Sequence, residues 1–303
     1  MSQQKTGAEH ASFGNQLQIT SFLADVIALF KGVVLIANVL PVFTGFWLAA
    51  HFTNTVIDPN LFFLTIIGST LVMAGALVLN NWYEADIDRV MARTQVRPTV
   101  TGNISLKMAL GLGIALSALG FILLFFTTME AVLYAFIGWF TYVVMYTMWT
   151  KRKYTFNTVI GSISGAVTPL IGWGAIDSAM HIIPIVLFMI LFIWQMPHTF
   201  AIAMKRYDEY KAAGVAMLPV IRGFEMTKRQ IFVYVACLLP LPFFLVSLGT
   251  TFIVIATLLN LVWLVLAIRG FFVKDDVKWA RANFVVSVNY IAILFITMVI
   301  VTI

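Results

Sequence analysis

Charged residues are scarce in this sequence. Only 11% of its 303 residues are Asp, Glu, Lys or Arg, whereas 61% are hydrophobic. Soluble globular chains carry about 25% charged residues, so there are too few charged side chains here to make a water-exposed exterior. We therefore expect the lipid bilayer to surround most of the chain.

Cysteine and targeting signals are also nearly absent. Cys237 is the single cysteine, so no disulfide can form within the chain and no redox compartment follows from it. The first twenty residues hold neither the apolar core of a secretory signal nor the arginine-rich pattern of an organelle presequence. We predict a cytoplasmic tail at 1–24 and favour a bacterial plasma membrane over a mitochondrial one.

Long hydrophobic runs dominate the rest of the chain. A helix needs roughly 20 apolar residues to cross a bilayer, and these runs reach that length without the two-residue alternation of strands. They predict an all-α membrane protein, a bundle of nine transmembrane helices forming one domain at 25–303. The predicted spans are 27–51, 61–83, 106–126, 130–149, 157–176, 182–204, 230–249, 251–270 and 283–303.

The basic residues predict the orientation of this bundle. Lysine and arginine follow the second, fourth, sixth and eighth spans, whereas the opposite loops carry Asp58, Glu130 and Asp177. Basic loops mark the cytoplasmic side, so we expect the N-terminus in the cytoplasm and the C-terminus outside, which requires an odd number of spans. Because topology accounts for the net charge of +6, that charge does not indicate a nucleic acid partner.

The loop after the second span carries a row of polar side chains. Asn80, Glu84 and Asp88 are spaced by four residues, so they share one face if the helix continues. Mg²⁺ prefers one or two carboxylates together with substrate phosphates and water, and the planar guanidinium of Arg93 or Arg97 suits phosphate oxygens. The row predicts a metal–diphosphate site, with a solvated charged helix end as the alternative.

The loop after the sixth span strengthens the first of these interpretations. Lys205, Asp208 and Glu209 directly follow that span, on the same predicted side of the membrane. Two acidic clusters fit a shared site in which metal ions neutralise a departing diphosphate and an allylic cation forms. We predict Glu84 and Asp88 as metal ligands from the first cluster and Asp208 and Glu209 from the second, leaving open which of the last two binds.

Several short motifs occur in the order found in a known family. They are Asn80–Asn81 through Asp86–Ile87–Asp88, Met91, Arg93–Thr94, Arg97–Pro98, Tyr146–Thr147, Lys151–Arg152, Trp194–Gln195, Pro197–His198, Asp208 through Tyr210, Ala213–Gly214, Met217–Leu218–Pro219, Trp279–Ala280, Phe284 and Ser287. With these motifs, over about residues 25–300, the sequence resembles the intramembrane UbiA-type prenyltransferases and, within them, the protohaem IX farnesyltransferase (haem O synthase) branch. It departs at Glu84, where the family usually has aspartate.

The resemblance implies a fold, substrates and a cofactor. The bundle would surround a central cavity open to lipid, with the active site on the cytoplasmic side. Farnesyl diphosphate would be the donor and haem B the acceptor, whose vinyl group would take the farnesyl group and water to give haem O. Mg²⁺ is the implied cofactor, and haem A synthase or a terminal oxidase are candidate protein partners.

Four further residues have two interpretations each. Lys31 either extends to the lipid headgroups or binds the diphosphate. Lys151 and Arg152 are either topology charges or diphosphate ligands. His198 either ligates haem iron or forms a hydrogen bond between helices.

Two other functions compete with haem farnesylation. The nearer one keeps prenyl transfer but uses a quinone or chlorophyll precursor as acceptor; the Trp194–His198 segment and the Met217–Leu218–Pro219 stretch match the haem branch better. The other is a membrane transporter, since helical bundles with buried charges often move solutes. Against transport, the acids cluster in loops on one predicted face instead of at mid-membrane.

Overall fold

The computed structural model describes residues 23–303, and every regular element in that range is a helix. The all-α prediction is therefore confirmed for this part of the chain. The predicted tail at 1–24 lies, except for its last two residues, outside the described residues.

Eight helices in the described range are long and apolar enough to cross a membrane. Two are composite, because α7 continues as the π-helix η1 and α12 as the 3₁₀ helix η2. The eight are α2 (Gly32–Thr53), α3 (Pro59–Tyr83), α6 (Leu106–Phe125), α7–η1 (Met129–Phe140 and Thr141–Thr150), α10 (Ile182–Lys205), α12–η2 (Leu218–Leu238 and Leu241–Leu248), α13 (Thr250–Arg269) and α14 (Asp276–Ile300).

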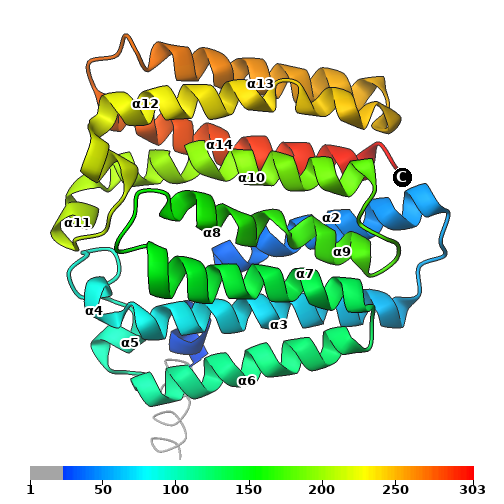
Figure 1. Cartoon of the computed structure of the whole chain (residues 1–303), viewed down its shortest axis with the longest axis horizontal. Coiled ribbons are helices and arrows are strands. Elements are labelled where there is room, and N and C mark those ends of the chain that lie inside the picture. Colours follow the sequence, from blue (N-terminus) through cyan, green and yellow to red (C-terminus); the bar gives the residue numbers. More distant parts are fainter. Residues whose placement is uncertain (1–22) are drawn as a thin grey trace, which may run out of the picture.

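The predicted span at 157–176 is divided into two shorter helices, α8 (Asn157–Ala166) and α9 (Thr168–Gly174). Pro169 explains the break, because it lacks an N–H and its ring clashes with the carbonyl four residues earlier. That carbonyl belongs to Gly165 and accepts a hydrogen bond from the Thr168 hydroxyl instead, at 2.7 Å. α8 and α9 nevertheless follow one another between α7 and α10 (Figure 1).

Three predicted span limits need correction. The first span begins at Gly32 and not at 27, because Lys31 adopts a left-handed conformation with φ 49° and separates α2 from the helical residues 23–29. The seventh begins at Leu218 and not at 230, with a kink at Gly223, where φ is 77°. The ninth span begins at Asp276 and not at 283. The predicted boundary between the spans 230–249 and 251–270 is confirmed, since Gly249, with φ 88°, separates η2 from α13.

Close helix contacts position the central elements. α3 packs along α6, α2 along α9, and α10 contacts α8, α12 and α14. A Cβ added to Gly45 would overlap the Pro169 carbonyl, and one added to Gly172 would overlap the Val42 carbonyl. The backbones of α2 and α9 therefore touch, as small residues permit in membrane helices.

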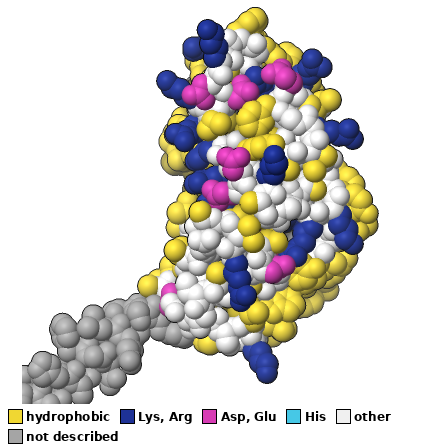
Figure 2. All heavy atoms as spheres, turned by 90° about the vertical axis from the view of Figure 1, so that its left-hand side faces the viewer, with side chains coloured by type: hydrophobic (Ala, Val, Ile, Leu, Met, Phe, Trp, Pro, Cys, Tyr) yellow, Lys and Arg dark blue, Asp and Glu magenta, His cyan; other side chains and the backbone are white. Residues whose placement is uncertain are grey.

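Three of the short helices gather at one end of the bundle. α4 (Ala85–Asp88), α5 (Pro98–Thr101) and α11 (Tyr207–Ala212) all lie at the left of Figure 1, where α13 also connects to α14. Viewed from that end, Lys and Arg side chains surround several Asp and Glu side chains, with hydrophobic side chains along the rim (Figure 2). We call this the polar end.

Candidate active site

The predicted row of polar side chains is buried at the polar end of α3. Asn80 lies in the last turn of α3, Glu84 directly follows the helix, and Asp88 ends α4; all three are almost completely buried. The Glu84 N–H donates to the Asn80 carbonyl and the Asp88 N–H to the Glu84 carbonyl, both at 2.9 Å. Helical spacing therefore persists across the junction of α3 and α4, which keeps the row on one side.

Each member of the row meets a basic side chain from another segment. Lys31 Nζ donates to Asn80 Oδ1 at 2.5 Å, and Lys151 Nζ donates to Glu84 Oε1 at 2.5 Å. Arg97 pairs with Asp88. The amide nitrogen of Asn80 is held as well, since Asn80 Nδ2 donates to Thr147 Oγ1 at 3.0 Å. The structure thus brings together six of the predicted site residues: Lys31, Asn80, Glu84, Asp88, Arg97 and Lys151.

The charges in this cluster shift one another's pKa values. Burial raises the pKa of Glu84, but the positive charges of Lys151 and Lys31 outweigh burial and hold it below 4.5. Burial lowers the pKa of Lys151, but the Glu84 charge outweighs burial and keeps it above 10.5. Burial, followed by repulsion from Arg97, lowers the pKa of Lys31 well below 10.5. An anion bound here would relieve that repulsion.

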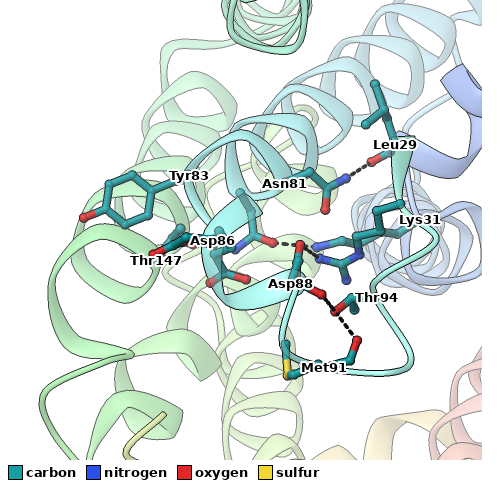
Figure 3. A network of polar contacts seen from close by, with 12 residues as sticks. Leu29, Lys31, Asn81, Tyr83, Asp86, Asp88, Met91, Thr94 and Thr147 are labelled. Carbon is teal, nitrogen blue, oxygen red and sulfur yellow. Dashed lines mark hydrogen bonds and ion pairs between the residues drawn. The ribbon is translucent and has the colours of Figure 1, made fainter. Parts of the chain in front are cut away.

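The loop after α4 bends back toward Asp88. Thr94 Oγ1 donates to the Asp88 carbonyl at 2.9 Å and lies 3.3 Å from the Met91 carbonyl oxygen (Figure 3). The Thr94 N–H donates to the same Met91 carbonyl at 2.9 Å. On the neighbouring face of α3, Asn81 Nδ2 donates to the Leu29 carbonyl at 2.7 Å (Figure 3). The Thr94 bonds hold the loop that follows Asp88, and the Asn81 bond holds the segment that leads to Lys31.

Two predicted diphosphate ligands lie outside the buried cluster. Arg152 forms two 2.7 Å hydrogen bonds with the exposed carboxylate of Asp86. Arg93 is exposed in the loop after α4. To reach a diphosphate at the row, both side chains would have to turn inward.

The second acidic cluster lies beside the first, without an ion pair or hydrogen bond between them in residues 23–303. Asp208 is exposed, Glu209 pairs with Arg206 at 2.8 Å, and the Lys205 ammonium lies 4.7 Å from the centre of the Phe284 ring. Ile87 of α4 packs in one apolar cluster with Tyr210 of α11, so the two loops are neighbours.

Asn157 ties this second loop to the segment after η1. Its Nδ2 donates to the Ala216 carbonyl at 3.0 Å and to the Tyr154 carbonyl at 2.8 Å. From the sequence, Asn157 at the start of a span is either a helix N-cap or a substrate contact. In the structure Phe156 occupies the cap position, and the Asn157 side chain connects two loops. No sequence signal identified that role, because Ala216 is far away along the chain.

Free carboxylate oxygens give this site room for a hard cation. Asp88 Oδ1 and Glu209 Oε2 are buried and have no hydrogen-bond partner, although buried polar atoms rarely lack one. No group of three or more Asp, Glu, His or Cys side chains suited to a metal occurs within the described part of the chain. A magnesium ion would therefore take its remaining ligands from a substrate diphosphate and water, as it commonly does.

An apolar cavity of about 230 Å³ lies between the helices, next to the part of α3 that runs from Ser69 to Leu77, before the row begins at Asn80. Its wall includes Asn38 of α2, Ser69 of α3 and Gln195 of α10, with Tyr142 and Tyr146 of η1. Along α3, the distance from Asn80 to Ser69 is about 16 Å at the rise of an α-helix. The π-helical form of η1, a form frequent at functional sites, was not predicted from the sequence.

His198 lies on the side of α10 that faces α14. Its Nδ1 lies 2.8 Å from Ser287 Oγ, and its ring stacks on Trp194 with 4.6 Å between the ring centres. The cavity wall takes Gln195 and Thr199 from the same helix, but not His198. The predicted hydrogen bond between helices is therefore present, from His198 of α10 to Ser287 of α14. The other ring nitrogen of His198, Nε2, forms no hydrogen bond to the described residues.

Comparison with known proteins connects this geometry to a family. Residues 38–289 match the UbiA prenyltransferase family. The chain belongs to the UbiA prenyltransferase family.

Two relatives within this UbiA family are similar over nearly their whole length. A protein named protoheme IX farnesyltransferase from Oceanobacillus iheyensis is 55% identical over 295 residues, which cover 96% of this chain and 94% of the relative. One of the same name from Bacillus cereus is 57% identical over 286 residues, 93% of each chain.

Solved structures share the UbiA fold at low identity. A structure described for digeranylgeranylglyceryl phosphate synthase superposes with a TM-score of 0.75 at 18% identity, covering 93% of this chain and 99% of that one. A UbiA homolog from Archaeoglobus fulgidus bound to GPP and Mg²⁺ has a TM-score of 0.65 at 16% identity, covering 90% and 99%. At these identities the likeness shows the fold.

Proposed function

We infer that this chain transfers a farnesyl group from farnesyl diphosphate to the vinyl group of haem B, with addition of water, giving haem O and diphosphate. The carrying observation is the 57% identity, over 93% of both chains, to a relative named protoheme IX farnesyltransferase. The buried row above an apolar cavity supplies the polar and apolar halves that a prenyl diphosphate needs. Membership of a prenyltransferase family also removes the case for a transporter.

The cluster around the row is the proposed diphosphate site. Lys31, Arg97 and Lys151 bring three positive charges to one place, and phosphate oxygens are suitable partners for all three. Leaving diphosphate would be stabilised there by charges that are already in position. Arg93 and Arg152 would act at the rim, where they are exposed or half-buried.

Glu84 and Asp88 would hold Mg²⁺ together with Asp208 or Glu209 of the second loop. The oxygens of Asp88 and Glu209 that have no hydrogen-bond partner support this ligand set. The packing of α4 beside α11, through Ile87 and Tyr210, supports a contribution from both loops. When bound, the ion supplies neutralisation of charge on the leaving diphosphate. Asn80, held between Lys31 and Thr147, would orient the diphosphate by its amide.

The cavity would receive the farnesyl chain and keep water from the allylic cation. Tyr142 and Tyr146 line the cavity near the row, and aromatic faces attract cations most strongly where water is excluded. Lys151 already lies 5.3 Å from the centre of the Tyr146 ring. These rings would therefore stabilise the positive charge close to the carbon that loses diphosphate.

The face of α10 toward α14 is the proposed contact surface for haem. Ser287 fixes His198 through Nδ1, which leaves Nε2 available to iron in the way that an outer hydrogen bond orients a ligating histidine. Lys205 is two turns further along the same face and lies over Phe284. Its ammonium would suit an acidic side group of the porphyrin.

For the membrane, we propose nine spans, with α8 and α9 together forming the fifth. The N-terminus and the polar end would face the bacterial cytoplasm, because basic side chains gather at that end (Figure 2). The C-terminus would lie outside, and haem O would pass to haem A synthase or a terminal oxidase.

The direct test is to incubate the purified protein with haem B, farnesyl diphosphate and Mg²⁺ and to measure haem O by mass spectrometry. Product should form with Mg²⁺ and not after chelation. Parallel reactions should replace haem B by an aromatic quinone precursor or a chlorophyll precursor. Prenylation of one of these without haem O would overturn the acceptor assignment, as would no product when the Bacillus cereus relative is active in the same assay.

A further inference from the structure

Trp139, in α7, separates two apolar spaces. One is the central cavity, whose wall it shares with Val72 and Met73 of α3. The other is an open groove on the outer surface of α6 and α7. The groove is lined by Phe121, Phe125, Met129, Glu130, Val132, Leu133, Phe136 and again Trp139.

The indole is fixed in place by a hydrogen bond. Trp139 Nε1 donates to Ser117 Oγ of α6 at 3.0 Å, and Ser117 Oγ donates to the Gly113 carbonyl at 2.8 Å. A buried indole N–H needs such a partner. Gly75 of α3 lets Ser117 approach, because a Cβ there would overlap the serine hydroxyl. The wall at Trp139 is therefore held by α3 and α6 together.

The groove leads away from the cavity and into lipid. Leu133 and Phe136 are exposed on α7, and Phe125 and Met129 are exposed near the end of the bundle opposite the polar end. A hydrocarbon chain that passed Trp139 would lie along apolar side chains and the bilayer interior. In that position an extended prenyl chain exposes no apolar surface to water.

We propose that Trp139 limits the length of the prenyl chain that this enzyme accepts. The proposal rests on the proposed function, in which the cavity receives the chain of a prenyl diphosphate. The cavity has a volume of about 230 Å³ and Trp139 forms part of its wall, so the length of chain that fits inside is limited. Removing the indole joins the cavity to the groove, so a chain one isoprene unit longer than farnesyl extends into the groove instead of meeting a wall.

The test compares kcat/KM for farnesyl and geranylgeranyl diphosphate with haem B as acceptor. Trp139→Ala should shift the ratio toward geranylgeranyl diphosphate by roughly tenfold or more, because apolar pockets discriminate single hydrocarbon groups by such factors. Trp139→Phe keeps a ring in the wall without the hydrogen bond and should retain the wild-type ratio. Phe136→Ala, which widens the groove alone, should retain it too.

A folded Trp139→Ala protein with the wild-type ratio would overturn the proposal. If that variant does not fold, Trp139→Leu removes part of the wall and should give a smaller shift in the same direction; an unchanged ratio there also overturns it. Farnesyl transfer with an unchanged ratio contradicts the chain-length role alone. Absence of haem prenylation by the wild-type protein with either donor contradicts the proposed function instead.

Discussion

Two aspartates in the same short helix have opposite surroundings. The Asp88 side chain is fully buried against Arg97, whereas the Asp86 side chain is 63% exposed against Arg152. Exposed ion pairs contribute about 0–1 kcal/mol, while a buried carboxylate with a free oxygen is suited to a ligand. Chemistry at α4 therefore depends on which face of the helix a residue occupies.

We expect Asp88→Asn to lower haem O formation by roughly 100-fold or more, as loss of a charge that stabilises a transition state does. Asp86→Asn, the matched control, should retain activity within about twofold, since an exposed pair contributes little. Initial rates of haem O formation at saturating Mg²⁺ measure both. Equal activity of the two variants, both folded by size-exclusion chromatography, would contradict the role of Asp88.

The lowered pKa of Lys31 predicts how kcat/KM for farnesyl diphosphate depends on pH. Its pKa lies well below 10.5 because of burial and the Arg97 charge. Its positive charge is therefore present at low pH and is lost as pH rises through that lowered pKa. kcat/KM for farnesyl diphosphate should fall on the alkaline side, and Lys31→Arg should move this fall to higher pH because arginine stays protonated. Coincident alkaline limbs for wild type and Lys31→Arg would show that another group causes the fall.

At the scale of elements, the contact between α2 and α9 has no space for a side chain. A Cβ at Gly172 would meet the Val42 carbonyl, whereas a Cβ at Gly111 of α6 would meet no atom within 4 Å. Gly172→Ala should lower stability by about 1–3 kcal/mol, the usual cost of overpacking, and Gly111→Ala should leave it unchanged or raise it. The midpoints of thermal unfolding of the two variants can be compared in detergent by tryptophan fluorescence. Equal midpoints would show that α2 and α9 can move apart without loss of folding free energy.

The hydrophobic runs were sufficient to predict most helices. A run of apolar residues has to be helical in lipid, because every backbone polar group needs a partner within its own segment. The runs did not predict where helices deform. Apolar content does not predict the π-helical geometry of η1 or the left-handed conformation of Lys31. Pro169, in contrast, was a local signal for the break between α8 and α9.

For the whole molecule, the orientation can be tested with single cysteines. With Cys237 replaced by serine, Ser178→Cys and Ile303→Cys should react with a membrane-impermeant maleimide in intact spheroplasts. Lys153→Cys should react after permeabilisation. All three positions are exposed. Labelling of residues 153 and 178 from the same side would contradict a span formed by α8 and α9, and protection of residue 303 would contradict an outer C-terminus.

Sequence by itself determined the all-helical membrane character of this protein, the grouping of basic loops and the row of Asn80, Glu84 and Asp88. Each follows from local rules: apolar length, charge near span ends and four-residue spacing along a helix. The tertiary structure decided which cation meets each member of the row and placed Asn157 between two loops. It also placed Trp139 between a cavity and a groove. Those relations join residues far apart in the chain, and side-chain spacing carries no information about them until the helices are packed.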